Sequence, residues 1–570
     1  MTVPGFPGDI ATFQTSSQTN VSLIFAIEIG GILFVPGANL FTITIGNQYT
    51  LVISGAGITN NSGVLQTFTG GTVSFTNAAT AGNLITFQNP AGITFTGSAN
   101  AGSATFNFLG GGGGMTFNDS TSAASANITA PDYSRSVVSF SDLSTAANAQ
   151  ITVAGYYGGS VVFRDGSTAG NSTITAADAA PISFFGHSTA GTATLNASNT
   201  TIELSENSTG EMSRVILNNT YGALDIGAHI APGVSVGSIE GYGEVGLGVN
   251  TLTVGANNAS TTYSGQIQDR YAGTLVKTGT GTLTLANSNG YHAGTRIDNG
   301  TLRASHDGAF GGIPVNVIIP NYVSVAPGAA LTLDSGATNN YIVDVASLII
   351  ATGSTVNLNF TGNPDRVRSF ILDGVTQPPG IYGGPFSSAT THLPQFNGTG
   401  TIVAVAKAVS RKVHGDAGMF DIDLPLAGGP GIECRDSNGD YQVVVTFTNN
   451  VTFSYVAVGV GTGYVSSYSG SGTNTVTANL TGVSNAQVIY VSIHDLNDGY
   501  GTTEMIIPIG ILIGDVSGNG TVNASDIAAV KTQLGQPVTT SNFRADVNPN
   551  GIVNASDVVK VKTLLGTSLP

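Results

Sequence analysis

Two copies of a twelve-residue loop near the end of the chain carry oxygen side chains at the spacing that a calcium ion requires. The copies, DVSGNGTVNASD (515–526) and DVNPNGIVNASD (546–557), begin 31 residues apart. Calcium takes six to eight oxygen ligands, and loops of this length supply them from positions 1, 3, 5, 7, 9 and 12. The sequence therefore predicts two calcium ions, one in each loop. The expected ligands are Asp515, Ser517, Asn519, Thr521, Asn523, Asp526, Asp546, Asn548, Asn550, Ile552, Asn554 and Asp557.

Glycine occupies position 6 of both loops, at Gly520 and Gly551, where the chain must turn sharply. Position 7 is expected to bind through its backbone carbonyl, and the asparagine at position 9 through a water molecule. Each loop is followed by a helical pattern that ends at glycine, IAAVKTQLG (527–535) or VVKVKTLLG (558–566). A short helix after each loop, with no full helix before it, distinguishes this pattern from a complete EF-hand.

In this arrangement the segment resembles the dockerin type I repeat. The resemblance implies a cohesin-like domain as partner, contacted through loop positions 10 and 11 and a nearby basic residue, in either of two orientations. Dockerin loops usually carry aspartate at position 5, where this chain has Asn519 and Asn550, so we expect weaker calcium binding. The alternative is a loop pair that only folds the C-terminus, with the chain's own upstream domain as its partner. The expected partner-binding residues are Ala524, Ser525, Lys531, Ala555, Ser556 and Lys562.

A second group of carboxylates recurs in the first half of the chain, two residues after a repeated phenylalanine. If the repeats stack as coils, these carboxylates form a ladder with one strand separation between neighbours. Such a ladder fits a cation site or a glycosidase-like acid pair, because crowded carboxylates raise each other's pKa. A turn that simply accepts Asp, Asn or Gly is the favoured interpretation, since glycine occurs in the same column. The column consists of Asn77, Gly97, Asp119, Asp142, Asp165 and Gly186.

The phenylalanines before this column define a repeat with spacings of 20 to 23 residues. A second apolar anchor follows most of them by eleven residues, for example Ile128 after Phe117 and Ile151 after Phe140. A unit of this size cannot bury its own apolar face, whereas stacked units bury Phe on Phe and Ile on Ile. The pattern therefore predicts a long parallel β-helix. The repeated triplets end at Phe75, Phe95, Phe117, Phe140, Phe163 and Phe184.

Residues 273–302, GTLVKTGTGTLTLANSNGYHAGTRIDNGTL, resemble the autotransporter-associated β-strand repeat of bacterial surface proteins. The likeness extends over most of residues 1–405. It implies export, a parallel β-helix and a bacterial source. It implies no activity, because the repeat is a building unit.

The character of the sequence changes after residue 405. The charged stretch 410–426 is interpreted as a linker, and the alternating segments after it predict a small immunoglobulin-like β-sandwich. The predicted fold is therefore all-β with three parts. These are a β-helix over 1–405, the sandwich over 406–512, and a small α-helical module with paired calcium loops over 513–570.

Composition limits the range of partners. Only 9% of the 570 residues are charged and the net charge is −16, which opposes binding to nucleic acid. The apolar stretch 505–514 contains a proline and is too short to span a membrane. Cys434 is the single cysteine, so no intramolecular disulfide forms. No export signal is visible, and we interpret the sequence as a mature chain or fragment from which the signal is missing.

The favoured functional hypothesis is a non-catalytic, adhesin-like scaffold outside the cell or on a bacterial surface. Its β-helix would contact glycans or another copy of the chain. One alternative is a polysaccharide-active or carbohydrate-binding subunit of a cohesin–dockerin complex, and another is a self-associating matrix or filament component. No enzyme is predicted, because Lys and Arg residues are scarce along the β-helix. In addition, His187 and His292 occur singly, without an acidic residue at the spacing of a catalytic relay.

Overall fold

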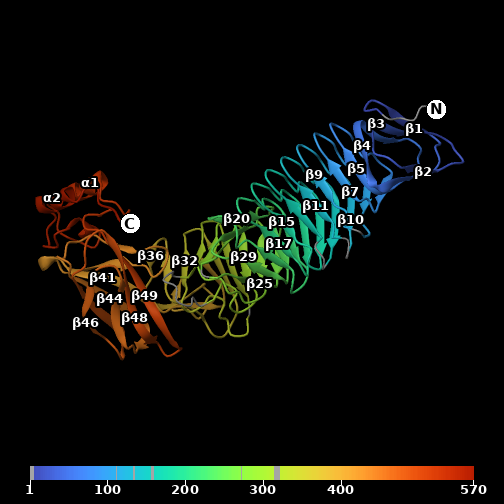
Figure 1. The fold of residues 1–570 in the computed structure, drawn as a ribbon. Coiled ribbons are helices and arrows are strands. Elements are labelled where there is room, and N and C mark those ends of the chain that lie inside the picture. The colour runs from blue at the N-terminus through green and yellow to red at the C-terminus, as the bar shows by residue number, and fades with distance from the viewer. Residues whose placement is uncertain are drawn as a thin grey trace. The chain divides into compact units, whose positions relative to one another are not determined.

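The computed structural model of the chain describes residues 6–110, 112–131, 135–155, 159–270, 272–312, 321–334 and 336–570. It divides into two compact units, Met1–Tyr291 with Asp298–Arg303 and His292–Ile297 with Ala304–Pro570. Strands dominate both units, and the α-helices of the described residues are α1 (Ala524–Thr532) and α2 (Ala555–Thr563) (Figure 1). None of the described helices has the length and apolar character needed to cross a membrane.

The first unit is a parallel β-helix whose successive coils stack as the repeat predicts (Figure 1). One series of strands carries the repeated phenylalanines and ends with a strand that has Leu204 in their place. These strands are β5 (Gln66–Phe75), β7 (Gly92–Phe95), β9 (Met115–Phe117), β11 (Val137–Phe140), β13 (Ser160–Phe163), β15 (Ile182–Phe184) and β17 (Thr201–Leu204). Each strand pairs in parallel with the next, and Phe117 lies opposite Phe140. The rings from Phe75 to Phe184 are fully buried, with successive centroids 4.7 or 4.8 Å apart. The predicted long parallel β-helix is therefore confirmed.

A second series of strands carries the second anchor of each coil: β8 (Thr105–Asn107), β10 (Asn127–Ala130), β12 (Gln150–Ala154), β14 (Thr173–Ala177), β16 (Thr194–Ser198) and β18 (Arg214–Leu217). Ile128, Ile151 and Ile174 stand opposite one another in consecutive coils and are at most 1% exposed. Small residues such as Ala146 and Ala169 are fully buried in the turns that close the coils. Burial of the same face in every coil explains why both anchors stay apolar.

The second unit begins with further parallel strands. β30 (Tyr322–Val325) pairs with β32 (Ser347–Ile350), and β32 pairs with β35 (Phe370–Leu372). β31 (Ala330–Asp334) pairs in the same way with β33 (Thr355–Asn359). This part of the unit therefore keeps the coil arrangement of a β-helix.

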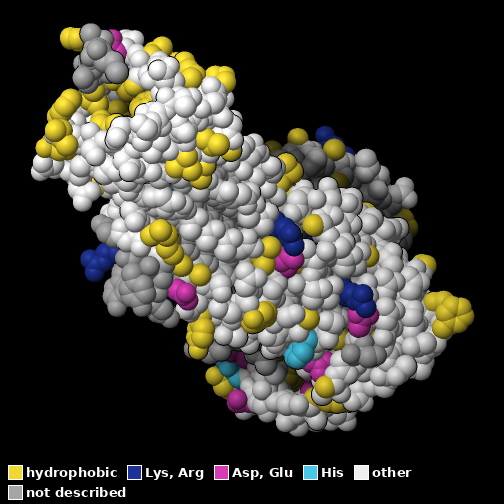
Figure 2. Space-filling view, turned by 90° about the vertical axis from the view of Figure 1, so that its right-hand side faces the viewer, with side chains coloured by type: hydrophobic (Ala, Val, Ile, Leu, Met, Phe, Trp, Pro, Cys, Tyr) yellow, Lys and Arg dark blue, Asp and Glu magenta, His cyan; other side chains and the backbone are white. Residues whose placement is uncertain are grey.

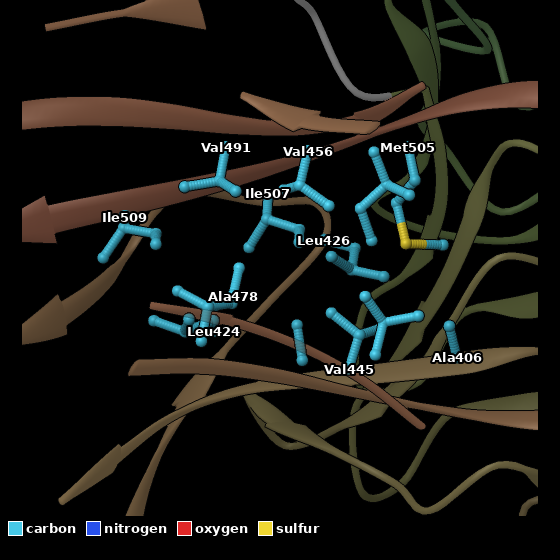
Figure 3. Packing of buried hydrophobic residues seen from close by; sticks show 14 of the residues in the cluster. Ala406, Leu424, Leu426, Val445, Val456, Ala478, Val491, Met505, Ile507 and Ile509 are labelled. Atoms are coloured by element: carbon cyan, nitrogen blue, oxygen red, sulfur yellow. The ribbon is translucent and has the colours of Figure 1, made fainter. Parts of the chain in front are cut away.

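Two sheets follow and share one hydrophobic core. The first has the order β42 (Met419–Leu424), β41 (Ala406–Val413), β44 (Tyr441–Val451), β47 (Thr473–Thr481), β46 (Tyr464–Ser469). The second has the order β43 (Gly431–Glu433), β49 (Thr502–Ile511), β48 (Gln487–Asn497), β45 (Tyr455–Val460). Figure 3 shows Val445 and Ala478 from the first sheet and Val491 and Ile507 from the second in this core. We call these two sheets the sandwich.

The interpretation of residues 410–426 as a linker is wrong. Most of this stretch lies in β41 and β42, which pair as an antiparallel hairpin. Two of its charges are paired across the hairpin, since Arg411 donates two hydrogen bonds to Asp421 at 2.8 and 2.7 Å. Paired charges on adjacent strands are compatible with a sheet, although in a sequence they look like a solvated segment.

The chain ends in a small module built from the paired loops and helices. α1 begins at the N-cap Asn523 and α2 at the N-cap Asn554, and both starts form a capping box with the aspartate three residues later. Val522, Val530, Val553 and other apolar side chains form a separate small core for this module. Each helix start is therefore joined directly to the last ligand position of its loop.

Candidate calcium site

The first loop wraps its backbone around two buried carboxylates. The oxygens of Asp515 accept hydrogen bonds from the backbone N–H groups of residues 518–520 at 2.8–3.1 Å. Asp526 accepts one from the N–H of Ser517 and one from the N–H of Asn523, both at 2.9 Å. Because the Ser517 hydroxyl also donates to Asp515, this residue joins the two carboxylates.

The second loop repeats this scaffold. Asp546 accepts hydrogen bonds from the N–H of Asn550 at 3.3 Å and of Gly551 at 2.9 Å. Asp557 accepts one from the N–H of Asn548 at 2.9 Å. The structure therefore brings the first and last predicted ligands together in each loop.

The electrostatics of the loops fit a divalent cation. Asp515, Asp526, Asp546 and Asp557 are all 0% exposed. Burial raises the pKa of Asp557, and the negative charge of Asp546 raises it further. No group of three or more His, Cys, Asp or Glu side chains suited to a metal gathers among the described residues. Two carboxylates per loop, completed by amide, hydroxyl and carbonyl oxygens, are an all-oxygen set of the kind that calcium prefers.

The predicted ligands at positions 5 and 9 also shape the backbone. The amide oxygens of Asn519 and Asn550 accept the N–H two residues further on, at 3.0 and 3.1 Å. The amide oxygens of Asn523 and Asn554 cap the two helices, each accepting an N–H at 2.8 Å. Their part in metal binding stays a prediction.

All six predicted partner-binding residues are exposed, and they lie in or beside the first and last turns of the helices. Ala524, Ser525 and Lys531 belong to α1, and Ala555, Ser556 and Lys562 occupy the equivalent places in α2.

Residues outside the predicted site attach the second loop to the sandwich. His414, in the turn between β41 and β42, donates from Nδ1 to Asp546 Oδ2 at 2.8 Å, and both side chains are 0% exposed. The turn lies so close that a Cβ on Gly415 would meet the Asn550 carbonyl oxygen at 2.3 Å. Loop and turn are therefore in direct backbone contact.

Arg544, between the two loops, attaches the first one. Its guanidinium donates to the carbonyl oxygens of Val516 at 2.9 Å and Asp515 at 3.0 Å, both in the first loop. It also donates to the carbonyl oxygen of Ile432 in β43 of the sandwich, at 3.2 Å. Sequence reasoning missed His414 and Arg544. The only signal was the concentration of charged residues around position 414.

The carboxylates of the column in the first unit lie in turns and form hydrogen bonds with the backbone. Asp119, Asp142 and Asp165 all have φ of 56°, in the left-handed region that favours Gly, Asn and Asp. Oδ2 of Asp142 accepts the N–H of Asp119 at 2.9 Å, and Oδ2 of Asp165 accepts the N–H of Asp142 at 3.3 Å. Each carboxylate thus bonds to the preceding coil, which supports the turn interpretation over a catalytic pair.

Comparison with known proteins gives two family matches. Residues 513–566 match the dockerin type I domain, and residues 275–304 match the passenger-associated-transport-repeat. Over 261 residues the chain is 28% identical to the adhesin BmaC autotransporter of Brucella suis biovar 1 (strain 1330). That alignment covers 43% of this chain and only 7% of the length of the relative. No solved structure matches. The chain therefore resembles autotransporter passengers in its β-helix and dockerin type I domains in its C-terminal module.

Proposed function

We propose that the chain is a non-catalytic, adhesin-like β-helical scaffold located outside the cell or on a bacterial surface, with a C-terminal module that binds calcium and docks onto a protein partner. The observation that carries the proposal is the pair of loops with buried carboxylates, in a segment that matches dockerin type I. The match of residues 275–304 to a passenger repeat and the likeness of the chain to an autotransporter adhesin support the location.

In this proposal two calcium ions bind, one to the oxygens of each loop, and supply the positive charge that offsets the buried carboxylates. The chain's own contribution is orientation. Backbone N–H groups hold Asp515 and Asp546 in place before the ion arrives. Asp526 is both the last ligand and part of the capping box of α1, so a closed loop fixes the helix start that presents Ala524 and Ser525.

A cohesin-like domain and the chain's own sandwich are both proposed as partners of the module, and they use different residues. The sandwich contacts the module through His414 and Ile432. The six predicted partner-binding residues stay exposed. We further propose that residues 406–512 form an immunoglobulin-like domain between a β-helix of residues 1–405 and the module of residues 513–570.

The β-helix is proposed to contact glycans or another copy of the chain. Its outer surface carries rows of uncharged polar side chains, with Asn127, Gln150, Thr173 and Thr194 opposite one another in consecutive coils. The face in Figure 2 has few Lys, Arg, Asp or Glu side chains. Hydroxyl and amide groups suit hydrogen bonding to sugars, which keeps a carbohydrate-binding subunit and a self-associating matrix component as alternatives.

The test is a pull-down with the full chain as bait and exported proteins of the source organism as prey. Capture of a cohesin-like protein with calcium, and not with a chelator, supports the proposal. The control bait carries Ser525→Asp and Ser556→Asp, two exposed positions in the first helical turns where acidic residues preserve the helix. Failure of the wild-type chain to capture any such protein would overturn the proposed external partner and leave the sandwich as the remaining one.

A further inference from the structure

We propose that His414 positions the first carboxylate of the second loop, so that calcium binding by this loop depends on its attachment to the sandwich. The inference rests on the proposed calcium binding. The two loops share nine of twelve residues, and besides the differences at positions 3, 4 and 7 they differ in the groups that surround them.

The imidazole of His414 is held in one tautomer and one orientation. Its Nε2 lies 3.3 Å from Nη1 of Arg435, and because a guanidinium can only donate, Nε2 is the acceptor. Nδ1 therefore carries the hydrogen that is donated to Asp546. Arg435 is itself fixed by Glu433, at 2.7 and 2.8 Å, and by the carbonyl oxygen of Phe420 at 2.8 Å. All these side chains except Phe420 are fully buried.

This hydrogen bond decides which oxygen of Asp546 faces the metal. Oδ2 accepts from both His414 and Gly551, whereas Oδ1 accepts only the 3.3 Å bond from Asn550 among the described residues. Oδ1 is therefore the oxygen left for calcium. Groups that orient a metal ligand from behind typically change metal affinity by about 10–100-fold.

The first loop has no equivalent support. In the described part of the chain the carboxylate of Asp515 accepts hydrogen bonds from its own loop alone. The group beside the first loop is instead a cation of the module itself, since Nη2 of Arg544 lies 3.0 Å from the Asp515 carbonyl oxygen. A positive charge at this place opposes calcium, while Arg435 behind the second loop is paired with Glu433. Both observations make the second loop the tighter site.

Coupling of this kind is reciprocal. If attachment to the sandwich strengthens calcium binding in the second loop, calcium in that loop strengthens the attachment by the same factor. Calcium in the second loop is therefore expected to protect the turn at residues 413–418 from hydrogen exchange.

The experiment titrates the full chain with calcium alone in a calorimeter. Asn519→Ala leaves only the second loop complete, and Asn550→Ala leaves only the first, with both changes at exposed side chains. Two substitutions of His414 are compared in each background. His414→Phe keeps the ring contacts to Phe420 and Phe543, at 5.2 and 6.1 Å, but cannot donate. His414→Asn keeps an N–H donor near Nδ1 and loses the ring.

We expect His414→Phe to weaken the second loop by about 10-fold or more and His414→Asn to restore most of that loss, with the first loop unchanged. If His414 had only a structural role, calcium affinity would depend on the aromatic ring. His414→Phe would then keep the affinity and His414→Asn would lose it. An unchanged second loop with His414→Phe, or an equal loss in both loops, would overturn the inference while leaving calcium binding intact. No binding by the wild-type chain would overturn the proposed function itself.

Hydrogen exchange of chains with an unaltered His414 gives a second measurement if His414→Phe does not fold. Calcium should protect the turn at residues 413–418, which contacts the second loop, in the Asn519→Ala chain and not in the Asn550→Ala chain. Equal protection in the two chains would contradict the coupling.

Discussion

Phe117 and Phe140 lie face to face in consecutive coils, with ring centroids 4.7 Å apart and planes 3° from parallel. Phe163 continues the stack on the other side of Phe140 at 4.8 Å. This spacing is close to the separation of hydrogen-bonded strands, so the ring stack and the strand ladder favour the same register. Phe140 is therefore packed on both flat faces.

Phe140→Ala is expected to destabilise the first unit by about 3–5 kcal/mol, because it leaves a cavity between two rings. The measurement is urea denaturation of the full chain, followed by proteolysis to locate the unfolded part. Phe140→Leu is the matched control, since Leu204 already stands opposite Phe184 in this series. Leu should cost less than about 1.5 kcal/mol, and equal losses from both variants would contradict the stacking argument.

Asp142→Asn should leave stability nearly unchanged, whereas Asp142→Ala should lower it by about 1–2 kcal/mol. Asparagine tolerates the left-handed backbone and keeps an acceptor for the N–H of Asp119, and alanine does neither well. Denaturation curves measure the difference. Calorimetry on Asp142→Asn also tests the cation hypothesis, because a fall in the number of bound calcium ions would make the column a metal site.

Arg435→Leu should destabilise the second unit by about 3–5 kcal/mol, because Glu433 then keeps a buried charge without its partner. Although burial raises the pKa of Glu433, the charge and hydrogen bonds of Arg435 hold it below its usual value. Arg411→Leu is the control, since its ion pair with Asp421 is partly exposed and should be worth less than about 1 kcal/mol. Thermal melts of both variants test this contrast.

Asp365→Asn should stabilise the second unit at neutral pH by about 1–3 kcal/mol. Asp365 is 0% exposed, and its Oδ1 has no hydrogen-bond partner among the described residues. Burial raises the pKa of Asp365 well above its usual range, and the charge of Asp344 adds to the rise.

The folded chain therefore binds more protons at Asp365 than the unfolded chain does above pH 4, approximately the unfolded pKa. Wild-type stability from this group is complete below that pH and falls as the pH rises towards the raised pKa. The advantage of Asp365→Asn should accordingly grow from about pH 4 to pH 7 in melts over that range. An advantage independent of pH would rule out this titration as its cause.

Calcium should raise the melting temperature of the second unit. At a concentration about 100-fold above the dissociation constant, one bound ion contributes about 2.7 kcal/mol. Calorimetric scans with calcium and with a chelator measure the shift. A chain with both Asn519→Ala and Asn550→Ala should lose most of it, and an undiminished shift in that chain would place the calcium elsewhere.

The sequence predicts the β-helix well because every coil repeats the same contacts. The spacing of Phe117 and Phe140 in the sequence therefore indicates which residues pair between coils. The loops are equally visible, because their ligands lie within twelve residues. His414 is different, since it meets Asp546 across 132 residues and no local pattern marks either residue for the other. The sequence of residues 410–426 predicts a linker wrongly for a related reason, because Arg411 and Asp421 lie side by side only when their strands pair.

Each coil in the central part of the β-helix presents the same upper and lower surface to its neighbours. Phe117, Phe140 and Phe163 recur at intervals of 23 residues, and Asp119, Asp142 and Asp165 follow at the same interval. Duplication or loss of one such interval in the gene therefore leaves every remaining coil with a suitable neighbour. Unequal recombination can lengthen or shorten this part of the protein in whole coils. The length of the β-helix can therefore change between generations while its fold stays the same.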